Sequence, residues 1–169
     1  GAVDGPPWSY WGALPFAVFL GMHVVYTKRL WELWFALSVA VTGTMIDTVY
    51  NATGLISYNG TYPILSFLGP IWITAMWAGL AVCYDHSLKV LIGRPVWTFA
   101  VGAFFGPLAY WSGKGMGAIR FLYDDWTMMF ILAAPWGFKM IFDYWMLEQW
   151  RPNAEDVVRA DRSKYSTEF

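Results

Sequence analysis

The chain is poor in charge. Only 14% of its 169 residues are charged, 57% are apolar, and the formal net charge is −1. From Leu30 to Tyr84 the only charged residues are Glu32 and Asp47, and from Pro95 to Ser112 there are none. Soluble domains carry about 25% charged residues. The low charge argues against an ordinary soluble domain, and the near-neutral balance argues against nucleic acid as a partner.

Cysteine and the usual catalytic motifs are also scarce. Cys83 is the only cysteine and lies in an apolar run, so no intrachain disulfide forms and a small buried side chain is expected there. The two histidines show neither an HExxH nor an HxxxH spacing. Sequence motifs therefore assign the chain no metal site, no cofactor and no enzymatic reaction.

The sequence instead contains five long apolar runs. They are Trp11–Tyr26, Leu30–Tyr50, Pro70–Tyr84, Pro95–Ser112 and Trp126–Leu147. A helix needs about 20 apolar residues to cross the hydrocarbon core of a bilayer, and it satisfies its own backbone groups there. We therefore predict an all-α fold, a polytopic transmembrane bundle of five helices within residues 1–150. A polar tail over residues 151–169 should follow, with a short exposed helix at Asn153–Lys164.

Basic residues indicate the orientation of this bundle. They follow the first, third and fifth runs: Lys28, Arg29, Lys89, Arg94, Arg151, Arg159, Arg162 and Lys164. The loop after the second run, residues 51–69, carries no charge. The positive-inside rule then places the C-terminus in the cytoplasm. Because residue 1 is glycine rather than methionine, we expect the native chain to begin upstream.

Asp47 is the first candidate functional residue, because an acid inside a membrane helix is costly. The fourth run ends with Tyr110 on the same, outer side, and the glycines beyond Ser112 leave free backbone N–H groups beside Lys114. Such a turn could hold an anion such as a lipid phosphate. The simpler interpretation is a packing surface followed by a loop. In either case Asp47 can pair with Lys114 or Arg120.

Helix packing is indicated at two places. Gly102 and Gly106 form a small-xxx-small pair that lets a neighbouring helix approach closely, and Pro107 favours a kink. In the fifth run Lys139 and Asp143 are four residues apart, so they lie on one face and can neutralise each other. The alternative is that Lys139 extends to the membrane surface.

Four polar residues fall at the predicted cytoplasmic ends of the runs: His23, Glu32, Asp85 and His86. Carboxylates and imidazoles together can bind a metal or move protons. The two histidines are also the only residues able to ligate haem on both sides. Polar residues are common at membrane interfaces, however, and Glu32 can pair with Lys28 one helical turn away. No metal is therefore assigned, and Asp85 and His86 are kept as candidate functional residues.

Two short segments resemble a known family. They are Gly43-Thr-Met-Ile-Asp47 and Gly106-Pro-Leu-Ala-Tyr110, the latter followed by Gly113 and Gly117. They resemble small proteobacterial inner-membrane proteins grouped as domain of unknown function 2878, over roughly Gly1 to Phe121. The resemblance implies a location in the bacterial cytoplasmic membrane and a sixth helix ahead of residue 1. It implies no particular activity.

Two functions fit these observations. The first is a structural or accessory subunit of a larger membrane complex, with membrane lipids and other membrane proteins as partners. The alternative is a lipid-binding or lipid-modifying membrane protein, in which Asp47, Tyr110 and Lys114 line an outward-facing polar site.

Overall fold

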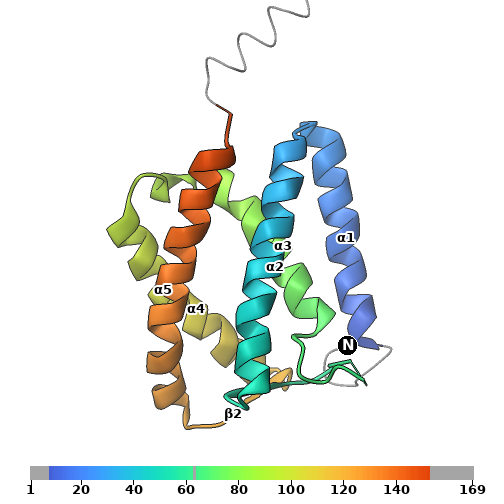
Figure 1. Cartoon of the computed structure of the whole chain (residues 1–169), viewed down its shortest axis with the longest axis vertical. Coiled ribbons are helices and arrows are strands. Elements are labelled where there is room, and N and C mark those ends of the chain that lie inside the picture. Colours follow the sequence, from blue (N-terminus) through green and yellow to red (C-terminus); the bar gives the residue numbers. More distant parts are fainter. Residues whose placement is uncertain (1–7, 63, 153–169) are drawn as a thin grey trace, which may run out of the picture.

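Five α-helices make up most of the chain. The computed structural model describes residues 8–62 and 64–152. The helices within these residues are α1 (Trp8–Thr27), α2 (Leu30–Ala52), α3 (Ile71–Asp85), α4 (Pro95–Gly115) and α5 (Asp125–Trp150). Each covers one of the five apolar runs, so the predicted all-α class is confirmed (Figure 1). The helix expected at Asn153–Lys164, and most of the polar tail, lie outside the described residues.

Local sequence explains where the helices start. Pro95 stands in the first turn of α4, where its missing N–H removes no hydrogen bond and its fixed φ suits a helix. Asp124 caps α5, since its side chain accepts a hydrogen bond from the Thr127 backbone N–H at 3.1 Å. Hydrogen bonds from Thr127 hold the pKa of Asp124 below its usual value. The cap therefore keeps its negative charge beside the positive end of the helix dipole.

The helices pack as two groups. The most extensive helix contact joins α4 to α5, while α3 packs against both α2 and α1. Contacts between α2 and α5 connect the groups, and α3 and α4 touch each other little. The α4–α5 contact needs glycine, because a Cβ on Gly102 would lie 2.7 Å from the backbone oxygen of Trp136. At Gly106 a Cβ would overlap the Trp136 ring itself.

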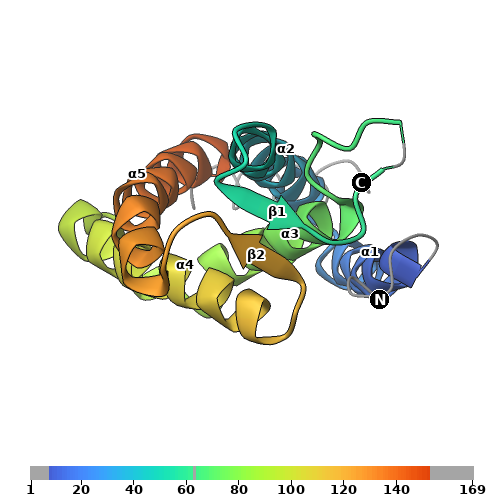
Figure 2. The ribbon, with the colours of Figure 1, turned by 90° about the horizontal axis from the view of Figure 1, so that it is seen from below.

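A short sheet closes one end of the bundle, and the sequence did not predict it. Strand β1 (Ile56–Tyr58) pairs with the antiparallel strand β2 (Ile119–Phe121), with Ser57 opposite Arg120. Ile56, Tyr58 and Ile119 are buried, and the view along the bundle shows the two strands lying across the helix ends (Figure 2). The uncharged segment after α2 is therefore folded onto the helices.

Apolar side chains cover the outside of the bundle. Large apolar residues are exposed on four of the helices: Phe19, Met22 and Val25 on α1; Trp34, Val41 and Met45 on α2; Trp97, Phe104 and Trp111 on α4; Phe130, Phe138 and Trp145 on α5. Buried positions meanwhile include Glu32, Asp47, Lys139 and Asp143. Among the described helices, α2, with a mean hydropathy of 1.3, has the length and composition of a membrane span.

Candidate functional site

Asp47 lies at the centre of a closed hydrogen-bond network. Its side chain is fully buried, and its two carboxylate oxygens accept three hydrogen bonds from three other elements. The hydroxyl of Tyr58 on β1 donates to Oδ1 at 2.5 Å, and the hydroxyl of Tyr110 on α4 donates to the same oxygen. The indole N–H of Trp77 on α3 donates to Oδ2 at 2.6 Å. One carboxylate therefore links α2 to β1, α3 and α4.

The surroundings of Asp47 are shaped for this network. Trp77 reaches the carboxylate because Gly43 stands one turn earlier on α2, where any Cβ would overlap the indole ring. Burial raises the pKa of the Tyr58 hydroxyl, with the charge of Asp47 acting in the same direction. Tyr58 therefore stays protonated and serves as a donor. The Gly43-x-x-x-Asp47 spacing thus provides space for the indole and an acceptor for its N–H.

Lys114 does not join Asp47 and Tyr110. Its ammonium group pairs with Asp125 at the start of α5, where both side chains are about 40% exposed. Trp111 donates to the other oxygen of Asp125 at 3.1 Å. Of the three residues expected to form an outward-facing site, the structure brings together Asp47 and Tyr110, inside the bundle. Lys114 belongs to a separate surface ion pair.

A second buried network occupies the middle of the bundle. Lys139 Nζ lies 2.5 and 2.6 Å from the two oxygens of Asp143, and the Tyr84 hydroxyl donates to Asp143 at 3.1 Å. The ammonium group also lies 4.6 Å from the centre of the Trp77 ring, a cation–π contact. Lys139 is only 6% exposed, so mutual neutralisation with Asp143 is confirmed. Trp77 is shared between the two networks.

A cleft opens where α3 and α4 fail to pack. Its volume is about 530 Å³, within the range of about 300–1,000 Å³ usual for small-molecule sites. Met76 and Leu80 line it from α3, Phe105 and Ala109 from α4, and Met140 from α5. Among residues 8–62 and 64–152, none of those that line the cleft is charged.

Some of the aromatic residues that line the cleft also take part in the buried polar networks. Trp77, Tyr110 and Trp136 line the cleft, and the Trp77 and Trp136 rings stack with centroids 4.6 Å apart. The polar atoms of Trp77 and Tyr110 point instead to Asp47. Asp47 therefore holds the aromatic wall in place without exposing its charge to the cleft.

The four polar residues at the other end of the bundle do come together. His23 Nε2 lies 2.5 Å from Glu32 Oε2, and His86 Nε2 lies 3.6 Å from the same oxygen. Arg29 connects Asp85 to this group. Its guanidinium lies 3.1 Å from a carboxylate oxygen of Glu32 and 3.9 Å from one of Asp85. The pairing of Glu32 with Lys28 suggested by sequence is replaced by this group, in which Arg29 is the basic partner.

The sequence did not predict two of the three donors to Asp47, Tyr58 and Trp77. Tyr58 lies in the uncharged loop predicted after the second run, and Trp77 is one of many aromatic residues in the chain. The available signal was the burial cost of Asp47 itself, which requires donors from elsewhere in the chain. Nothing in the local sequence singled out these two residues.

Comparison with protein families assigns the chain to one of them. The model of a family described as proteins of unknown function, DUF2878, matches residues 2–142. The chain belongs to this family. The DUF2878 segment includes Glu32, Asp47 and Lys139, and it ends one residue before Asp143. No curated protein and no solved structure matches the chain. The family resemblance seen in the sequence is therefore confirmed.

Proposed function

We propose that the protein is a multi-pass membrane protein that binds the apolar tail of a lipid in the cleft between α3 and α4. The observation that carries this proposal is the cleft of about 530 Å³, lined by apolar and aromatic side chains. Because it lacks charged groups, it suits an acyl chain better than a polar metabolite. The proposal agrees with the lipid-binding alternative predicted from the sequence, but it locates the lipid in this cleft and not at an outward-facing polar site.

The surface around the cleft supports a lipid as the occupant. Met76, Phe105 and Met116 line the cleft and are themselves 46%, 61% and 69% exposed, so its mouth opens onto the apolar outside of the bundle. Contiguous apolar surface of this kind marks contact with a membrane or another apolar partner. In a bilayer this mouth faces the acyl chains directly.

The arrangement of the chain supports the membrane assignment. α1, α2, α4 and α5 are 20, 23, 21 and 26 residues long, close to the roughly 20 needed for one crossing. The C-terminal ends of α1, α3 and α5, each followed in the sequence by basic residues, lie at one end of the bundle, and the sheet lies at the other (Figure 1). The positive-inside rule then puts the basic end in the cytoplasm of a bacterial inner membrane.

A cleft-filling substitution tests lipid binding. Ala109 lines the cleft, whereas Ala100 is exposed on α4 outside it, nine residues away and so on the opposite helical face. Ala109→Phe should lower the lipid that stays with the purified protein after extensive detergent washing, at least about fivefold. Ala100→Phe should retain the wild-type amount. Lipid extraction and mass spectrometry, normalised to protein, give the measurement.

Either of two results contradicts the proposal. One is a washed wild-type protein that holds no lipid, and the other is equal retention by Ala109→Phe and wild type. The accessory-subunit function stays a prediction that the same preparation tests. Membrane proteins that co-purify in fixed stoichiometry would support that function.

A further inference from the structure

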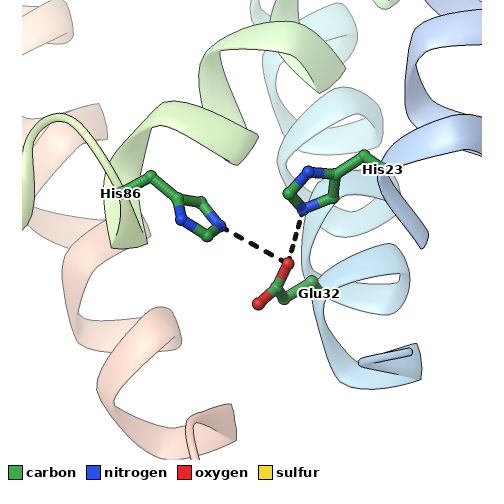
Figure 3. A group of neighbouring side chains, drawn as sticks. All are labelled: His23, Glu32 and His86. Carbon is green, nitrogen blue, oxygen red and sulfur yellow. Dashed lines mark hydrogen bonds and ion pairs between the residues drawn. The ribbon is translucent and has the colours of Figure 1, made fainter. Parts of the chain in front are cut away.

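The only two histidines of the chain meet at one oxygen of Glu32 (Figure 3). His23 comes from α1, Glu32 from the first turn of α2, and His86 from the residue that ends α3. The two imidazole rings lie edge to face with centroids 5.2 Å apart. Three separate elements therefore each bring one metal-binding type of side chain to a single point.

The spacing of the three donor atoms fits a metal ion. His23 Nε2, Glu32 Oε2 and His86 Nε2 all lie within 4.8 Å of one another. An ion bonded to each at about 2.0–2.2 Å would hold them about 3.0–3.6 Å apart. The Glu32–His86 separation of 3.6 Å is already in this range. The His23–Glu32 separation of 2.5 Å is that of a hydrogen bond, and it must open by about 0.5–1 Å when an ion binds.

We propose that His23, Glu32 and His86 bind a divalent first-row transition-metal ion, with water in the remaining coordination positions. Two imidazoles and one carboxylate are a donor set used for zinc and for ferrous iron. The His86 side chain is 41% exposed, so the site is open to water on that side. None of the three residues lines the lipid cleft, and the proposal is independent of lipid binding. It replaces the sequence-based expectation of no metal site.

Neighbouring ion pairs orient the carboxylate. Arg29 donates to Glu32 Oε1 at 3.1 Å, which leaves Oε2 directed at the two imidazoles. Asp85 lies 3.9 Å from Arg29 and 3.3 Å from Arg151. Metal-binding carboxylates are commonly fixed by hydrogen bonds of this kind. The two guanidiniums are balanced by the two carboxylates, so the charge around the site does not exclude a cation.

Zinc titration tests the proposal. The full chain is purified without a polyhistidine tag, treated with a chelator and titrated with zinc chloride by isothermal titration calorimetry. The wild-type protein should bind one zinc ion per chain. His86→Ala should lower the affinity at least about tenfold, and Glu32→Gln should lower it as well. Glutamine keeps an acceptor for Arg29 while it removes the charged ligand, so Glu32→Gln provides a second variant if His86→Ala unfolds.

A cysteine variant supplies the control. Cys83 is the one thiol in the chain, and Cys83→Ser should bind zinc as wild type does. Circular dichroism of each variant without zinc shows whether the fold is retained. Wild-type protein that takes up no zinc would overturn the proposal. So would folded His86→Ala and Glu32→Gln proteins that bind zinc as tightly as wild type, or loss of binding in Cys83→Ser.

Discussion

Helix α2 carries two buried carboxylates, one near each end, and they have different partners. Asp47 is 0% exposed and accepts hydrogen bonds from two phenols and an indole. Glu32 is 6% exposed and meets a guanidinium and two imidazoles. The exposed fractions of the two side chains are almost equal. The difference between them lies in the chemistry of the groups that surround them.

Phenol and indole groups satisfy the hydrogen-bonding needs of a carboxylate, because both keep their protons near neutral pH, and an indole N–H has no lone pair for an ion. Imidazoles have a lone pair when neutral, and they are among the commonest metal ligands in proteins. The Asp47 end of α2 is therefore closed by the protein itself. The Glu32 end presents donor atoms that a cation can bridge. Buried acids in this chain thus serve two purposes, packing at one end and ligand binding at the other.

The largest effect is expected at the closed end. Asp47→Ala leaves three buried donors without an acceptor, and it should destabilise the protein by about 3–5 kcal/mol. Asp47→Asn should have an intermediate effect, because its amide keeps one acceptor oxygen but directs N–H groups at another donor. Thermal unfolding in detergent measures both. A wild-type melting temperature for Asp47→Ala would show that the network does not hold the bundle together.

The Lys139–Asp143 pair adjoins the Asp47 network through Trp77. Its disruption should have the next largest effect on stability. Lys139→Met leaves Asp143 buried without its counter-charge and should cost about 3 kcal/mol. The double variant Lys139→Met, Asp143→Leu should recover most of that loss, since it removes both charges. The same unfolding measurement applies. A double variant as unstable as the single one would argue against charge pairing as the cause.

Zinc should distinguish the two ends in a stability measurement. At a free concentration about 100 times its dissociation constant, it should stabilise the wild-type protein by about 2.7 kcal/mol, or a melting temperature about 5–10 °C higher. His86→Ala should show no such rise, whereas Asp47→Asn should start lower and still respond. An equal response in His86→Ala would place the zinc elsewhere.

The smallest effect is expected at the surface ion pair. Lys114 and Asp125 are about 40% exposed, and exposed pairs contribute little to stability. Lys114→Ala should therefore leave both the melting temperature and the amount of retained lipid close to wild type. A large loss of retained lipid in this variant would restore Lys114 to the functional site that the sequence suggested.

The helices were predictable because their signals are local. The stretch without charge from Pro95 to Ser112 lies within α4, and Pro95 marks its first turn. The small-xxx-small pair in α4 likewise depends on a spacing visible in the sequence. The three-residue strands were not predictable, because a run as short as Ile56–Tyr58 has no detectable alternation.

The partners of the polar residues were less predictable, because they come from distant parts of the chain. Asp47 and Tyr110 were placed together from the sequence, yet the other two donors to Asp47, Tyr58 and Trp77, lie 11 and 30 residues from it and were not predicted. His23, Glu32 and His86 were noticed together because the predicted topology puts their helix ends on one side. Their convergence on one oxygen depends on how α1, α2 and α3 rotate about their axes, which no spacing in the sequence specifies.

The claim that the Glu32 end of α2 is open to a cation, while the Asp47 end is closed, is tested most directly by X-ray absorption spectroscopy of the zinc-loaded protein. The account predicts a first shell of nitrogen and oxygen at about 2.0–2.1 Å. It also predicts the outer-shell scattering of two imidazole rings, reduced to one ring in His86→Ala. A shell of oxygen alone, or a sulfur ligand at about 2.3 Å, would contradict it.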